Sequence, residues 1–98
     1  MDMYRHGDLL LVEVGAVPQE AVPTENRVLA EGEVTGHHHR AHDVQVLTLD
    51  DDLWFIARQG AHVTHEEHGR IDIAPGAYKV VRQREYDPFA DAVRRVQD

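Results

Sequence analysis

Apolar and polar residues alternate along this chain in short stretches that predict β-strands separated by turns. Residues 8–14 form an aliphatic run, and residues 27–31 form a second one. From 43 to 49 the apolar residues Val44 and Val46 are separated by a polar one, which is the period of two of a half-buried strand. Aliphatic and β-branched residues of this kind suit a pleated, partly buried surface, so each stretch is expected to be a strand.

The second half of the chain continues this pattern and then changes to a helical one. Further strands are expected at 53–57, 71–73 and 77–86. Asp87 followed by Pro88 is typical of a helix start, because aspartate caps the first turn and proline suits the first helical position. Apolar residues then recur at helical spacing (Phe89, Val93 and Val96), so we expect a short C-terminal helix over 87–97.

Together these elements predict an all-β, mainly antiparallel fold of about seven short strands, arranged as a small barrel or sandwich. Residues 15–26 contain two prolines and are expected to form a partly extended loop. A chain of 98 residues has room for one core, so residues 1–98 are expected to form a single domain.

The amino-acid composition limits the kinds of molecule that the protein is expected to bind. The formal net charge of −8 opposes attraction to phosphate backbones, so a nucleic-acid partner is not expected. No apolar run approaches the ~18 residues of a membrane span, and the N-terminal residues lack the parts of a signal peptide. We therefore expect no membrane association and a cytoplasmic location. The absence of cysteine excludes disulfides and thiolate metal ligands.

Histidine is the unusual component of the sequence, because most of the 8 histidines gather in two segments. The first segment is 37–42, and the second is 62–68. In an extended chain His37 and His39 point to the same side, and His38 points to the other. Two imidazoles from one strand are thereby able to meet a single ion.

This pattern predicts a divalent-metal site. Imidazole and carboxylate groups are good ligands for zinc and similar ions, usually in sets of three or four. The predicted ligands are His37, His39, His65 and His68, with Glu66 or Glu67 as a general base or a further ligand. Zinc is the first expectation, and nickel, iron, manganese and cobalt also fit these ligands. The site requires both histidine segments to lie at the same end of the sheet.

Other interpretations of the histidines remain open at this point. They are also compatible with solvated loops, with hydrogen bonds to carboxylates, or with a metal-free catalytic or pH-sensing role. A zinc protease is excluded, because the sequence His65-Glu-Glu-His68 is one residue too short for the His-Glu-x-x-His pattern.

The chain shows two resemblances to known families. The elements Gly32, His37-x-His39, a later histidine and Ala74-Pro75-Gly76 resemble the motifs of the cupins, small β-barrels that hold one metal with histidines and a glutamate. This chain lacks the glutamate after His39, and its later histidines precede the Pro-Gly turn. The stretches Gly32-Glu-Val-Thr-Gly-His, Thr64-His-Glu-Glu-His and Val80-Val-Arg-Gln-Arg-Glu-Tyr-Asp-Pro are similar to those of small uncharacterised bacterial or phage proteins. That resemblance implies such an origin and no particular activity.

Three functional hypotheses follow from the sequence. The first is a metal-binding β-domain that carries out hydrolytic or other small-molecule chemistry, with its status as an enzyme left open. The second is a non-enzymatic accessory or adaptor domain, acting through a protein partner or a homo-oligomer, whose contacts would be marked by exposed aromatic residues (Trp54, Phe55, Tyr86 and Phe89). The third is a module that responds to pH through its histidines.

Overall fold

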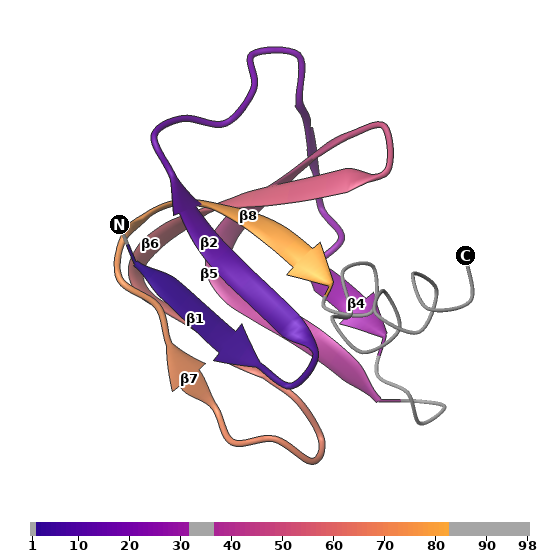
Figure 1. Ribbon diagram of the computed structural model, residues 1–98, viewed down its shortest axis with the longest axis vertical. Coiled ribbons are helices and arrows are strands. Elements are labelled where there is room, and N and C mark those ends of the chain that lie inside the picture. The colour runs from indigo at the N-terminus through magenta and orange to yellow at the C-terminus, as the bar shows by residue number, and fades with distance from the viewer. Residues whose placement is uncertain (1, 32–36, 83–98) are drawn as a thin grey trace, which may run out of the picture.

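The computed structural model of the protein describes residues 2–31 and 37–82. Within these residues every regular element is a strand, and every pair of neighbouring strands is antiparallel, which confirms the predicted all-β class. The strands are β1 (Met3–His6), β2 (Leu9–Val14), β3 (Val22–Thr24), β4 (Val28–Glu31), β5 (His38–Leu49), β6 (Asp52–Thr64), β7 (Ile71–Asp72) and β8 (Gly76–Arg82) (Figure 1). No helix in this described part of the chain is long and apolar enough to cross a membrane.

The strands form one sheet with the order β1-β2-β8-β6-β5-β3, in which β4 also pairs with β5 and β7 also pairs with β6. Of the two predicted arrangements, barrel or sandwich, the closed barrel is not formed, because no backbone ladder in residues 2–31 and 37–82 joins β1 to β3, β4 or β7. Closure requires the end strands to pair in register along their length. Here β1 has 4 residues and β3 has 3, which leaves little strand for such a ladder.

A bulge divides the long β5–β6 hairpin into two halves. His42 lies opposite His62 and Val44 lies opposite Ala57, so residues 58–61 of β6 lie across from Asp43 alone. Asp43 and Gly60 both have positive φ there, at 58° and 86°. Such an insertion bends a strand and increases its local twist. Strand β6, expected only over 53–57, therefore continues through this bulge to Thr64.

The bent half of the hairpin brings the start of β5 and the β6–β7 loop beside the turn between β1 and β2. The hydroxyl of Tyr4 accepts a hydrogen bond from the amide of Ala74 at 3.1 Å, and the imidazole of His6 reaches the carbonyl of Gly69 at 3.0 Å. In Figure 1, β7 and the loop that leads to it lie next to β1. We call this contact between residues 3–8 and residues 37–39 and 65–74 the seam.

The main core lies on one face of the sheet. Phe55 stacks on Tyr78 with ring centroids 5.1 Å apart, surrounded by aliphatic residues from β2, β5 and β8. Trp54 lies on the other face, with the Lys79 ammonium 5.7 Å from its ring centroid. Trp54 and Phe55, expected as exposed contact residues, are only 7% and 0% exposed, because both have packing partners within the sheet.

Two strands differ from the expectation from sequence. Strand β1 was not predicted, because Met3–His6 contains too few apolar residues to show a period. Strand β3 lies inside the predicted loop 15–26, where Pro23 is tolerated because β3 is at an edge of the sheet. The predicted helix over 87–97 and the end of the strand over 77–86 lie outside the described residues.

Candidate metal centre at the seam

Five histidine rings meet at the seam, and we call them the histidine cluster: His6, His37, His39, His65 and His68. The ring centroid of His39 lies 4.5 Å from that of His65, 5.0 Å from that of His6 and 6.0 Å from that of His68. The ring centroid of His37 lies 5.5 Å from that of His65, which connects His37 to the other four rings. The members come from the end of β1, the start of β5 and the β6–β7 loop, so three separate segments of the chain build the cluster.

All four predicted metal ligands belong to this cluster. The rings of His37 and His39 both contact His65, whereas the backbone amide of His38 donates to Glu66 Oε2 at 2.9 Å. The two predicted general bases lie at the rim and are exposed, with Glu67 Oε1 3.6 Å from His37 Nδ1. His42 and His62 are not part of the cluster and stack on each other elsewhere.

Sequence reasoning missed two residues of the site, His6 and Asp8. His6 lies 33 positions before His39, and no motif spacing connects the two. The tripeptide His6-Gly7-Asp8 does predict a tight turn, but the partner of that turn depends on how the whole sheet curls. Only the folded arrangement shows that His6 belongs to the site.

The centre of the cluster is a close contact between His6 and His39. Their Nδ1 atoms lie 2.8 Å apart, and the two residues are 2% and 1% exposed. They are the only buried polar or charged residues among those that the structure describes.

The hydrogen-bond partners of the two Nε2 atoms determine whether the contact between the Nδ1 atoms is attractive or repulsive. His39 Nε2 lies 3.2 Å from Asp8 Oδ1, and His6 Nε2 lies 3.0 Å from the carbonyl oxygen of Gly69. A carboxylate and a carbonyl only accept hydrogen bonds, so the tautomer with the proton on Nε2 satisfies both outer contacts and leaves a lone pair on each Nδ1. The two Nδ1 lone pairs then point at each other, and this contact is repulsive unless a cation lies between them.

A proton is a poor candidate for that cation near neutral pH. Burial lowers the pKa of His39 to about 4, with smaller contributions in the same direction from His65 and His6 and an opposing attraction from Asp8. Burial also lowers the pKa of His6, with smaller contributions in the same direction from His68 and His65, although the bond to the Gly69 carbonyl opposes them. Both rings are therefore neutral at pH 7.

Gly7 allows the β1–β2 turn to pack directly on the cluster. Its φ is 63°, a conformation that residues with a side chain rarely adopt. A Cβ at this position would lie 2.8 Å from His68 Nε2 and 3.0 Å from His39 Cε1. The site therefore requires glycine here for two independent reasons, backbone conformation and space.

The remaining members differ in how freely they can offer a nitrogen. His37 Nδ1 is shielded from solvent and makes no hydrogen bond. His65 Nδ1 accepts the amide of Glu67 at 3.0 Å, so that nitrogen is already occupied. The bond from the His38 amide lowers the pKa of Glu66, which makes its carboxylate a weaker base than an ordinary glutamate.

The arrangement in residues 2–31 and 37–82 is not that of a filled metal site. No group of three or more histidine, aspartate or glutamate side chains there is placed as a set that could hold an ion. Two nitrogens around a tetrahedral zinc ion are about 3.3 Å apart, given bonds of about 2.0–2.1 Å. The His6–His39 separation of 2.8 Å is shorter than this, so an ion would have to part the two rings by about half an ångström.

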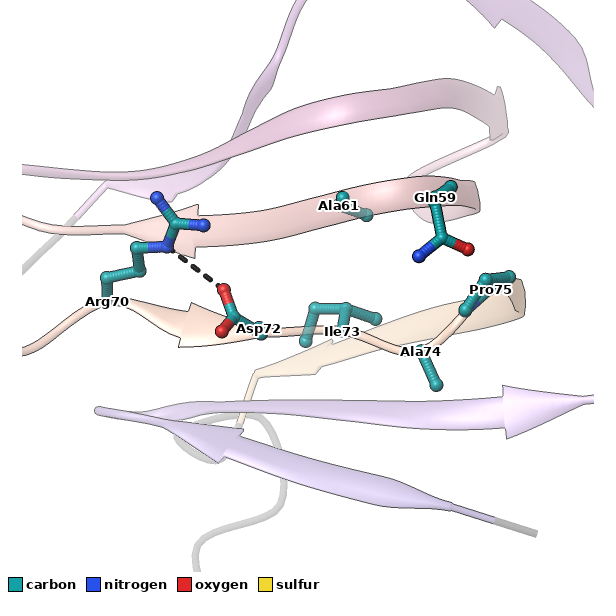
Figure 2. Close-up of a pocket in the computed structure, with 8 residues that line it drawn as sticks. Gln59, Ala61, Arg70, Asp72, Ile73, Ala74 and Pro75 are labelled. Atoms are coloured by element: carbon teal, nitrogen blue, oxygen red, sulfur yellow. Dashed lines mark hydrogen bonds and ion pairs between the residues drawn. The ribbon is translucent and has the colours of Figure 1, made fainter.

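Two hollows lie near the cluster. One of about 250 Å³ borders it and is lined by His38, Arg40, Thr64, His65 and Glu66. A larger one of about 380 Å³ lies beyond it, between β6 and the segment that leads into β8 (Figure 2). Figure 2 shows that its charged lining consists of Arg70 and Asp72, whose Nε and Oδ1 atoms pair at 3.0 Å. The larger hollow contains no histidine, so the cluster and this hollow are separate features.

These observations define a class: a small antiparallel β-protein with an open sheet and a histidine-lined seam. Residues 5–83 match the model of a family described as Domain of unknown function (DUF8820), and the chain belongs to that family. The matched range includes every member of the histidine cluster. No curated protein and no solved structure matches the chain. The expected relationship to an uncharacterised family is confirmed, and the comparisons do not show the cupin resemblance.

Proposed function

We propose that the protein binds a divalent transition-metal ion at the histidine cluster, with Nδ1 of His6 and Nδ1 of His39 as the first two ligands. The observation that supports this is the contact of two buried Nδ1 atoms at 2.8 Å, whose lone pairs repel each other when the outer contacts hold both protons on Nε2. A metal ion between the two nitrogens turns this repulsion into two bonds.

The contacts around the two rings also suit ligands. Histidines that bind metals usually donate their second ring N–H to a carboxylate or a backbone carbonyl, which fixes the ring and strengthens the ligating nitrogen. Asp8 accepts from His39, and the Gly69 carbonyl accepts from His6. Each of the two proposed ligands thus has the kind of partner that is expected behind a metal-bound imidazole.

His37 and His68 are the best placed to complete the set. His37 has a shielded Nδ1 without a hydrogen bond, and the His68 ring lies 5.7 Å from that of His6 and 6.0 Å from that of His39. His65 becomes a ligand only if it releases the amide of Glu67. The proposed ligand set therefore keeps the four histidines predicted from sequence, adds His6 and ranks His65 last.

An all-imidazole set favours borderline metals. Zinc, copper and nickel bind neutral nitrogen ligands well, whereas magnesium and calcium require oxygen. Zinc remains the first choice, with nickel, cobalt, iron and manganese behind it. Hydrolytic chemistry, with Glu67 beside His37 as the general base, stays a prediction. The cytoplasmic location and the bacterial origin also stay predictions.

The position of the site favours a structural contribution by the metal. It lies where the sheet curls back on itself without backbone pairing within residues 2–31 and 37–82. A bound ion would hold the β1–β2 turn against the start of β5 and the β6–β7 loop. Structural metal sites contribute directly to folding stability in this way.

Zinc titration by calorimetry tests the proposal, using tag-free protein and the variants His6→Gln and His39→Gln. We expect each substitution to remove the tightest zinc equivalent, because each removes one of the two opposed nitrogens. His38→Gln is the matched control: it lies beside His39 in the same strand but contacts Glu66, and should leave that equivalent in place.

Circular dichroism in the presence of a chelator checks that all three variants are folded. Equal zinc affinity in the three variants and the unsubstituted protein would overturn the proposal.

A further inference from the structure

A second pair of histidines lies outside the cluster, on strands β5 and β6. His42 and His62 are directly opposite each other in the antiparallel register. Their rings stack in nearly parallel planes, with centroids 4.5 Å apart and an angle of 11°. Their strand neighbours Ala41 and Val63 are buried in the main core, so the pair lies on the opposite face of the sheet.

The hydrogen bonds of the pair leave nitrogen lone pairs to offer. His62 Nδ1 donates to the Gly60 carbonyl at 2.9 Å, so its Nε2 carries the lone pair when the ring is neutral. His42 Nε2 lies 2.9 Å from the hydroxyl of Thr64. A hydroxyl accepts as well as donates, so His42 Nε2–H can donate to Thr64 and leave the Nδ1 lone pair for an ion.

The bulge also places a carboxylate near the same pair. Asp43 follows His42 directly and has a φ of 58°, and its Oδ2 lies 3.8 Å from where a Cβ on Gly60 would be. The Asp43 side chain thus reaches across the bulge toward the residue whose carbonyl holds His62. Its negative charge favours a cation at His42, although burial foremost, together with His62, Arg40 and Arg70, acts in the opposite direction and lowers the pKa of His42 overall.

We propose that His42 and His62 form a second, independent binding site for a divalent transition-metal ion, copper(II) foremost, with water completing the coordination. Side chains directly opposite each other on antiparallel strands have Cβ atoms about 4.5–5.5 Å apart, close enough for two imidazoles to reach one ion. Copper(II) binds imidazole more tightly than the other first-row divalent ions, and it accepts a square arrangement of two nitrogens and two waters.

This site differs from the seam in its expected behaviour. It joins two strands that are already paired along β5 and β6, so binding there adds little to the fold. With two protein nitrogens and open water positions it should bind more weakly than the cluster and exchange its ion faster. Binding at this second site does not depend on the function proposed for the seam.

The test is a copper(II) titration followed by calorimetry and by the broadening of backbone amide signals in NMR spectra. For the unsubstituted protein we expect two classes of site, the weaker one broadening the amides of residues 41–44 and 60–64. His42→Gln and His62→Gln should each abolish the weaker class and leave the tighter one unchanged. His6→Gln should do the reverse.

Thr64→Val and His38→Gln serve as controls on the same strands. Thr64→Val removes a hydroxyl that the site does not need as a ligand, and His38→Gln removes a histidine that lies outside both sites. Both should retain the weaker class. Weak copper binding that survives in His42→Gln and His62→Gln would overturn the inference, whatever happens at the seam.

Discussion

At the scale of single residues, the properties of the seam depend on which nitrogen of each buried imidazole carries a proton. Asp8 and the Gly69 carbonyl both act as acceptors and so assign the proton to Nε2 in His39 and His6. The same assignment leaves Nδ1 of each of these two buried rings as a lone-pair donor. Asp8 and Gly69, which would not contact the ion, therefore determine whether the Nδ1 atoms of His6 and His39 are available to bind it.

Asp8→Asn tests this influence. The amide oxygen still accepts the His39 N–H, but the loss of the negative charge weakens the basicity of Nδ1. Changes to such partners typically reduce metal affinity about 10- to 100-fold, and we expect a loss in that range for zinc, measured by calorimetry. Asp51→Asn, in the exposed turn between β5 and β6, is the control. Unchanged affinity in Asp8→Asn would argue against the assigned proton positions.

Gly7→Ala tests the close packing of the turn on the cluster. A Cβ there meets His68 and His39 at 2.8–3.0 Å and requires a φ of 63°, so we expect a loss of about 1–3 kcal/mol in the free energy of unfolding. Gly15→Ala is a matched control with nothing within 4 Å of its Cβ, and it should change stability by less than about 0.5 kcal/mol. Urea denaturation in the presence of a chelator measures both. Similar values for the two variants would contradict the packing described at Gly7.

The lowered pKa of His39 sets a pH dependence for the metal-free protein. Its pKa is 6.5 when unfolded and about 4 when folded, so between these values the unfolded chain binds the proton and the folded protein does not. Stability then increases as pH rises from about 4 to about 6.5 and levels off above it. Denaturation midpoints across this range should show the slope, and His39→Gln should reduce it. A slope that persists unchanged in His39→Gln would assign it to other groups.

At the scale of elements, the sequence predicts what depends on local pattern. The strands over 8–14, 27–31 and 43–49 appear near their expected places as β2, β4 and part of β5, because alternation and β-branched residues act locally. The pattern also put His37 and His39 on one side and His38 on the other. The rings of His37 and His39 both contact His65, and His38 Nδ1 lies 3.9 Å from Glu66 Oε1. Strand β1 and the bulge at Asp43 were not predicted, because short edge strands and bulges are stabilised by pairing partners.

The metal should act on the elements at the seam. Loop residues 65–70 and strand β1 have few backbone partners across the seam, so in the metal-free protein their amides are expected to exchange quickly with deuterium. Zinc should slow exchange at β1 and at residues 65–70 more than at the β2–β8 pair. Equal protection of both regions would indicate stabilisation of the whole fold, without a local effect at the seam.

At the scale of the whole molecule, the histidines lie where the curled sheet approaches closure without achieving it. Strand β1 pairs only with β2 among the described strands, and its side chains contact Gly69 and Ala74, which flank β7. Local sequence cannot distinguish a closed barrel from an open sheet, because closure depends on the summed twist and bends of all the strands. For the same reason, the sequence could indicate a histidine site but could not include His6 in it.

The most direct test of the proposed metal centre is a crystal structure of the zinc-soaked, tag-free protein, with anomalous scattering recorded at the zinc edge. We expect one strong peak at the seam, about 2.0–2.1 Å from Nδ1 of both His6 and His39. In that structure Asp8 and the Gly69 carbonyl should still accept the two Nε2–H groups. An anomalous peak bound by other residues, with the His6 and His39 nitrogens still 2.8 Å apart and no ion between them, would contradict the proposed centre.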